Sequence, residues 1–248
     1  PNIHHSNRVA SQARFAPSDA WHNALYWMKD NTPEPFADTD FYYKLYEPPA
    51  RGERYDYPDS AYGVTAWWDY GYWITRMAHR LPSANPGQST GPITNVANLF
   101  LSREEASARD IMQTLDSSYI IIDYPTTIVK YWAIIQWAER DLADFFDVYH
   151  LPEEGNLVPV TLFYPEYYRS LAVRLYNFDG KAIAPQRMIV ISYEDKVTKD
   201  GRAYKQITSG TEYTDYQEAL EYVESQKIAN YRIVSDSDIS LTSMPIPR

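Results

Sequence analysis

Apolar positions recur at helical spacing near the start of the chain. Between residues 18 and 30, Trp21, Leu25 and Met28 follow one another at i, i+4 and i+7, behind an N-capping serine. This segment is predicted to be a helix. Pro33 ends it, because the residue before a proline is pushed out of the helical region.

The rest of the chain mixes strand and helix spacing, with two predicted loops: an extended, proline-rich surface loop over 33–60 and a second loop over 82–92. Short runs of β-branched and aromatic residues predict strands at 61–66, 119–123, 188–193, 203–208 and 231–235. Longer segments predict helices at 69–80, 102–115, 127–148, 165–176 and 216–226. Ser102 is expected to open its helix as part of a capping-box variant, and Asp200-Gly201 to turn a hairpin.

Strands interleaved with helices predict a mixed α/β fold. Residues 1–180 are expected to form a helix-rich central core. Residues 181–248 are expected to form a smaller, hairpin-bearing C-terminal portion that packs on the same core. No internal repeat or low-complexity tract interrupts this organisation.

Composition narrows the classes of partner. The chain of 248 residues carries 23 Lys and Arg against 33 Asp and Glu, so a formal charge of −10 argues against nucleic acid. Its 23 Tyr and 7 Trp suit binding of peptides or sugars, and the lack of Cys excludes disulfides and thiolate chemistry. No run approaches the roughly eighteen apolar residues of a membrane span. We therefore expect a soluble piece of a longer protein.

The most informative stretch is Trp67-Trp68-Asp69-Tyr70-Gly71. Two adjacent indoles followed by a carboxylate supply two apolar walls and one hydrogen-bond acceptor. Such a pocket suits a small side chain that carries both a methyl and a hydroxyl, because the rings exclude water from the bond to the carboxylate. Asp69 is also expected near a helix N-terminus, where the helix dipole favours a carboxylate.

This run resembles the WWDYG signature of the catalytic subunit of oligosaccharyltransferase. In that family the motif binds the Ser or Thr two residues after the acceptor Asn. The family's second motif is an Asp, two residues, a Lys, three residues, then Met or Ile. Lys130 and Ile134 fit it, but Thr127 stands where Asp is expected. Lys130 and Ile134 share a helix face and are expected to close the pocket that Trp67, Trp68 and Asp69 open.

The resemblance is to the archaeal AglB type, and it implies several partners. These are an acceptor polypeptide with Asn-X-Ser/Thr and a lipid-linked oligosaccharide bound through an N-terminal multispan domain that is not in this sequence. That domain is expected to hold a divalent metal, Mn or Mg, at the extracytoplasmic face of the cell membrane. No catalytic residue or metal ligand is assigned here, so the fragment alone is predicted to be inactive.

Two other classes stay open. Aromatic abundance alone also fits a stand-alone extracellular module that binds carbohydrate or peptide. A glycosidase would need two facing carboxylates, for which Glu104-Glu105 and Glu153-Glu154 are weak candidates. His4-His5 lacks the spacing of a metal site with the other histidines.

Overall fold

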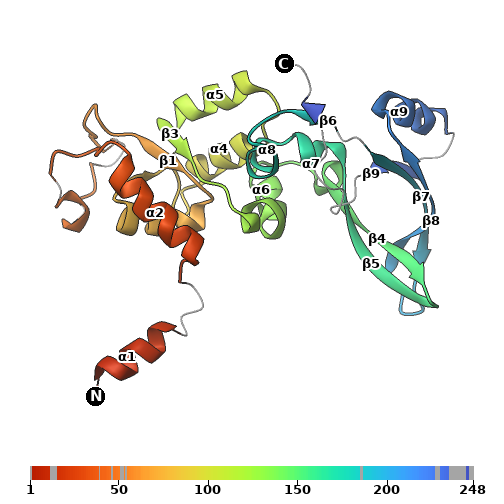
Figure 1. Cartoon of the computed structure of the whole chain (residues 1–248), viewed down its shortest axis with the longest axis horizontal. Helices are drawn as coiled ribbons and strands as arrows, with labels where there is room; N and C mark the ends of the chain where they lie inside the picture. Colours follow the sequence, from red (N-terminus) through yellow and green to blue (C-terminus); the bar gives the residue numbers. More distant parts are fainter. Residues whose placement is uncertain are drawn as a thin grey trace. The chain divides into compact units, whose positions relative to one another are not determined.

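The computed structural model has the predicted mixed α/β class (Figure 1). It divides into two compact units, which we call the motif unit (1–92 and 115–121) and the sheet unit (93–114 and 122–248). The predicted division at residue 180 stays a prediction. The structure describes residues 2–11, 16–38, 40–45, 47–50, 53, 55–184, 187–226, 230–234 and 244–245.

The motif unit is built on a small parallel sheet in the order β2-β1-β3 (Figure 1). The central strand β1, Gly63–Thr65, is completely buried and confirms the strand predicted there. β3, Ser117–Ile120, confirms the next one, although it starts earlier and is only partly buried. The remaining strand, β2 at Leu81–Pro82, was not predicted.

Helix α2, Asp19–Asn31, packs in the motif unit as its sequence predicts. The backbone N–H of Trp21 donates to Ser18 Oγ at 3.3 Å, which confirms the N-cap. Its buried side chains are those at the predicted apolar positions, Trp21, Leu25 and Met28. Helix α1 (Asn2–Ser11) precedes it and carries His4 and His5, which are exposed.

The helix predicted over 69–80 is confirmed but changes its hydrogen-bond pattern along its length. A 3₁₀ turn, η2 (Trp68–Tyr70), leads into α3 (Gly71–Trp73) and then into a π-helical turn, η3 (Ile74–Ala78). His79 ends it in the left-handed region, with φ 51°. We call residues 68–78 the motif segment.

The proline-rich stretch before β1 is only partly the surface loop that was predicted. Its one described regular element is a 3₁₀ turn, η1 (Phe41–Tyr43). Phe36 and Tyr42 are buried, and Phe36 stacks on Phe41 with 3.6 Å between ring centroids. These aromatic side chains pack the segment onto the motif unit, because burying large apolar rings stabilises it even though its backbone is irregular.

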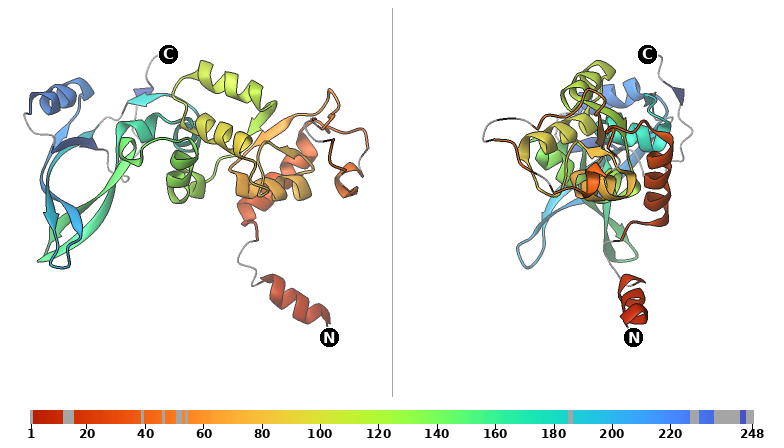
Figure 2. Two further views of the ribbon diagram at one scale, coloured as in Figure 1. Left: turned by 180° about the vertical axis from the view of Figure 1, so that it is seen from behind. Right: turned by 90° about the vertical axis from the view of Figure 1, so that its left-hand side faces the viewer.

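The sheet unit is organised around a five-stranded sheet in the order β5-β4-β8-β7-β9. All neighbouring strands are antiparallel except β4 and β8, which make a short parallel pair. Figure 2 shows the two long hairpins and their curvature. The strand bounds are β4 Phe146–Glu153, β5 Asn156–Phe163, β7 Met188–Val197, β8 Ala203–Tyr213 and β9 Tyr231–Val234. The predicted β7–β8 hairpin and the closing strand β9 are confirmed, and Gly201 turns the hairpin with φ 84°.

Helices complete the second part of the chain, and α9 packs on the β7–β9 region of the sheet. A two-stranded pair, β6 (Ile183–Ala184) with β10 (Met244–Pro245), adds to it. The helix bounds are α4 Thr90–Leu101, α5 Glu105–Thr114, α6 Tyr131–Trp137, α7 Pro165–Arg169, α8 Leu171–Phe178 and α9 Tyr216–Ser225. No helix in the described part of the chain is long and apolar enough to cross a membrane.

The prediction of a single long helix over 127–148 is wrong. A π-helical turn, η4 (Pro125–Val129), precedes α6, and the chain leaves the helix at Glu139, whose φ is 55°. A 3₁₀ turn, η5 (Leu142–Asp144), then leads into β4. The β4–β5 hairpin was missed because its turn, Glu154-Gly155, has only one glycine at its two left-handed positions.

Three further helix predictions need correction. Helix α4 starts inside the loop predicted over 82–92 and was missed. Ser102 does not cap α5, because its hydroxyl donates to the Asn98 carbonyl at 2.9 Å and so belongs to the end of α4. The helix predicted over 165–176 is two helices, α7 and α8, separated at Ser170, whose ψ is 142°.

Candidate functional site

The WWDYG motif begins two residues beyond β1, at the carboxyl end of the central strand of a parallel sheet. The order β2-β1-β3 means that the chain goes to one side of β1 and later returns on the other. Ligands of open α/β sheets bind at the carboxyl ends of the strands where this reversal occurs. Trp67, Trp68 and Asp69 therefore start at the position that this topology favours for a ligand.

The two tryptophans differ in their exposure. Trp67 is buried, whereas Trp68 is partly exposed, and their ring centroids are 6.3 Å apart at an interplanar angle of 51°. Nε1 of Trp68 is buried, and no residue in the described part of the chain accepts a hydrogen bond from it. Buried indole N–H groups usually have an acceptor, so this donor is suited to a ligand atom.

Asp69 follows directly and lies in the first turn of the motif segment, as predicted. Its residue is partly exposed, while its Oδ1 atom is buried. Tyr70 is buried instead, and its ring lies 4.3 Å from Trp21 of α2 and 5.4 Å from Trp73. Tyr70 thus fastens the motif to α2, and the residues before it carry the polar atoms.

Gly71 allows the motif segment to approach the chain that follows β2. A Cβ at this position would lie 2.5 Å from the Ala84 carbonyl oxygen and 2.7 Å from Asn85 Cα. These are backbone atoms, which cannot move aside as a flexible side chain can. The last residue of the motif is therefore glycine for reasons of packing.

The second motif lies in the sheet unit, across η4 and α6. Ile134 N–H donates to the Lys130 carbonyl at 3.2 Å, so the two residues are one helical turn apart as their spacing predicts. Lys130 is partly exposed, and Ile134 is completely buried. Their arrangement around Trp67, Trp68 and Asp69 stays a prediction.

Thr127 is buried rather than at the helix surface. Its hydroxyl donates to the Tyr124 carbonyl at 3.1 Å, and its own carbonyl accepts the Tyr167 hydroxyl at 3.1 Å. The turn before it is capped by Asp123, whose Oδ1 accepts the backbone N–H of Thr126 at 2.9 Å.

Sequence reasoning missed Arg80, which is completely buried at the end of the motif segment. Its only signal was a basic residue at the end of a predicted helix, which is ordinarily a surface position. The glutamate pairs considered for glycosidase chemistry are exposed. Within the described ranges, no three His, Cys, Asp or Glu side chains are grouped as metal ligands.

Comparison with known proteins shows which proteins this chain resembles. Residues 18–127 match the family of the AglB core domain. Dolichyl-phosphooligosaccharide-protein glycotransferase 3 of Archaeoglobus fulgidus is 30% identical over 238 residues, covering 85% of this chain and 27% of the relative. The Haloferax volcanii glycotransferase AglB is 33% identical over 224 residues, covering 80% of this chain and 20% of the relative. The chain thus spans about a quarter of the length of these relatives.

Solved structures agree with this match. Archaeoglobus fulgidus AglB in complex with an inhibitory peptide and a dolichol-phosphate has a TM-score of 0.55 at 28% identity, covering 75% of this chain and 24% of that one. An Archaeoglobus fulgidus oligosaccharyltransferase tethered to an acceptor peptide with the NVT sequon also has a TM-score of 0.55, at 27% identity and the same coverage. The predicted family is confirmed: the chain contains an AglB core-like domain and is homologous to the archaeal AglB oligosaccharyltransferases.

Proposed function

We propose that this chain is the acceptor-recognition part of an oligosaccharyltransferase that acts in asparagine-linked glycosylation. Trp67, Trp68 and Asp69 bind the Ser or Thr of an Asn-X-Ser/Thr sequon. The observation that carries the proposal is the buried Trp68 Nε1, which lacks an acceptor among the described residues, directly before a carboxylate. The position beyond the carboxyl end of β1 supports it.

A hydroxyl fits this pair of groups because it can donate and accept at once. It donates to the Asp69 carboxylate and accepts from Trp68 Nε1. The indole rings cover both bonds, and lowering the local dielectric strengthens a bond to a charged group. A threonine methyl adds apolar contact with the rings, so Thr is preferred to Ser.

The second motif completes the pocket in this proposal. This part of the proposal rests on the spacing of Lys130 and Ile134, which matches the family's second motif. Lys130 is the residue of this motif with an exposed part, so it is the one proposed to contact the sequon side chain. Ile134 is completely buried one helical turn away and is proposed to support Lys130.

The transfer reaction belongs to the longer enzyme. A relative is named dolichyl-phosphooligosaccharide-protein glycotransferase 3. Among the similar solved structures, one is a complex with an inhibitory peptide and a dolichol-phosphate, and another is a complex with Zn and sulfate. We assign no metal ligand to this chain, because no suitable group of side chains occurs among its described residues. A divalent metal, Mn or Mg, and the lipid-linked oligosaccharide bind to the membrane domain. This chain lies at the extracytoplasmic face and holds the acceptor in place, which alone can supply much of a rate.

Peptide kinetics with the full-length enzyme test the proposal. Trp68→Phe keeps an aromatic ring, although a smaller one, and removes the N–H, so it should raise KM for an Asn-X-Thr peptide on the order of tenfold. The matched control is Trp27→Phe, at a tryptophan that is 59% exposed on α2. Equal KM values for both variants and the parent enzyme would overturn the assignment of Trp68.

A further inference from the structure

A buried arginine, Arg80, follows the motif segment by two residues. Arg80 is 0% exposed, and the described structure gives its guanidinium one carboxylate, Glu34, at 3.2 Å. Leaving water costs a charged group several kcal/mol unless other bonds replace its hydration. A position of this kind is retained only where the protein supplies many acceptors.

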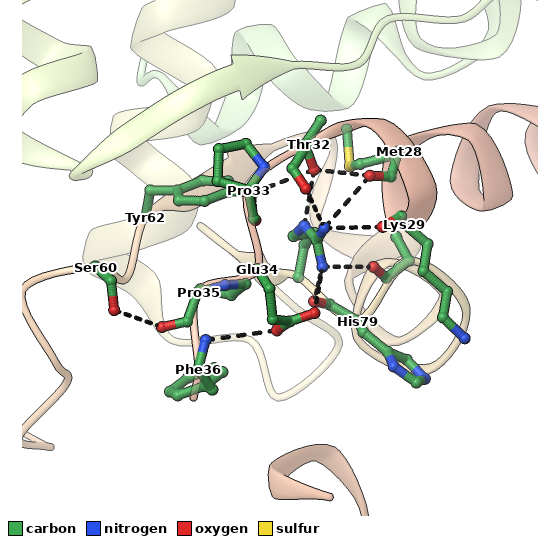
Figure 3. A network of polar contacts seen from close by, with 12 residues as sticks. Met28, Lys29, Thr32, Pro33, Glu34, Pro35, Phe36, Ser60, Tyr62 and His79 are labelled. Atoms are coloured by element: carbon green, nitrogen blue, oxygen red, sulfur yellow. Dashed lines mark hydrogen bonds and ion pairs between the residues drawn. The ribbon is translucent and has the colours of Figure 1, made fainter. Parts of the chain in front are cut away.

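Backbone carbonyls supply most of these acceptors (Figure 3). Nη2 donates to Lys29 O at 3.0 Å and Thr32 O at 2.7 Å, at the C-terminal end of α2, where the helix dipole favours a cation. Nη1 donates to Ala78 O at 3.2 Å and His79 O at 2.7 Å, at the end of the motif segment. One guanidinium therefore joins the ends of two helical segments.

The Thr32 hydroxyl extends this network to the other end of the motif. It accepts from Arg80 Nε at 2.8 Å and donates to Met28 O at 2.7 Å. The Tyr62 hydroxyl lies 3.1 Å from the same oxygen and 2.5 Å from the Pro33 carbonyl oxygen. Tyr62 lies before β1 and Arg80 lies after the motif segment, and both bond to residues 32–33. The chain that carries WWDYG is therefore attached to the same point on both sides of the motif.

Lysine could not make these contacts. The guanidinium is planar and presents five N–H donors in fixed directions, and the acceptors around Arg80 lie on several sides of it. An ammonium has three donors at one point. Arg80→Lys should therefore preserve the charge but lose some of the hydrogen bonds to α2 and to the motif segment.

We propose that Arg80 is a positioning residue for the sequon site: it holds the motif segment so that Trp68 Nε1 and the Asp69 carboxylate meet the acceptor hydroxyl together. This inference rests on the proposed function of those two residues. Arg80 itself does not contact the acceptor peptide in this proposal. Its effect on recognition passes through the position of the motif segment.

Acceptor kinetics of the full-length enzyme separate positioning from stability. A variant that only unfolds a fraction of the enzyme lowers Vmax equally for all peptides and leaves each KM unchanged. Arg80→Lys should instead raise KM for Asn-X-Thr on the order of tenfold, since small misplacements of binding groups are costly. It should also shrink the preference for Asn-X-Thr over Asn-X-Ser, because the methyl and hydroxyl contacts no longer align.

Two further variants keep the test decisive. Arg109→Lys, at an exposed arginine that pairs with Glu105, is the matched control and should leave KM unchanged. Glu34→Gln removes the negative charge but keeps an oxygen acceptor, so it should fold even where Arg80→Lys does not. Its KM shift should be smaller than that of Arg80→Lys and in the same direction.

The outcomes distinguish this inference from the proposed function. An unchanged KM and peptide preference in both Arg80→Lys and Glu34→Gln, with Trp68→Phe still impaired, would overturn the role of Arg80 alone. If Trp68→Phe and Asp69→Ala are also unimpaired, the proposed function itself fails. A raised KM in Arg80→Lys with a reduced Thr preference supports the positioning role.

Discussion

The regions that carry the two motifs have the same kind of irregular helical turn, but in different surroundings. Each contains a π-helical turn, η3 after WWDYG and η4 before Lys130, and such turns are frequent at functional sites. In the motif unit the turn leads to Arg80, and a buried donor on Trp68 has no acceptor among the described residues. In the sheet unit, the Thr127 hydroxyl donates to the Tyr124 carbonyl, and the Thr127 carbonyl accepts the Tyr167 hydroxyl. This difference supports the proposal that WWDYG, rather than the second motif, binds the sequon hydroxyl.

The largest expected effect is on the close approach in the motif unit. Gly71→Ala should lower the free energy of unfolding by about 3 kcal/mol, because the added methyl meets backbone atoms of Ala84 and Asn85. The control is Gly91→Ala, where a Cβ would meet nothing within 4 Å. Thermal or urea unfolding of both variants checks the difference. Equal stability would show that the motif segment can move away from Ala84 at little cost.

A smaller loss is expected in the sheet unit. Thr127→Asp replaces a buried donor by a carboxylate facing the Tyr124 carbonyl, so it should destabilise the chain by about 2 kcal/mol. Thr114 makes the same kind of bond to the Asp110 carbonyl but is exposed, and Thr114→Asp should change stability much less. Similar unfolding midpoints for the two variants would mean that the 127 position readily admits a charge.

The smallest effect concerns pH. Burial lowers the pKa of His79, and the nearby Lys29 acts in the same direction. The unfolded state therefore binds the proton more readily, so stability is complete above the ordinary pKa of about 6.5 and declines as pH falls below it. His79→Asn keeps a residue that tolerates the left-handed backbone at φ 51° and should reduce this decline. A parallel pH dependence of melting temperature in both proteins would contradict it.

Local signals predicted the parts of the fold that local chemistry determines. The spacing of Trp21, Leu25 and Met28 predicted α2 and its buried face, and Asp200-Gly201 predicted the β7–β8 turn. The β4–β5 hairpin gave only a weak signal, because its left-handed turn has Glu154 rather than asparagine or glycine before Gly155.

The candidate site shows the same limit. The residue types of WWDYG predicted a pocket with apolar walls and an acceptor, and the strand before it was placed correctly. Arg80 could not be predicted, because its acceptors are carbonyls of α2 that only the folded chain brings near. The burial of Thr127 could not be predicted either, because it lies in a π-helical turn that helical spacing does not signal.

The central claim is that Asp69 and Trp68 bind the hydroxyl of the sequon. Its most direct test measures kcat/KM of the full-length enzyme and of Asp69→Ala with peptides ending in Asn-X-Thr and in Asn-X-Val, which has the same shape without the hydroxyl. For the Thr peptide, Asp69→Ala should lose about 1.5–3 kcal/mol of transition-state stabilisation, the usual worth of a hydrogen bond to a charged group. For the Val peptide the substitution should cost little, because no bond is lost. Equal losses for both peptides would contradict the claim and make Asp69 a structural residue of the motif segment.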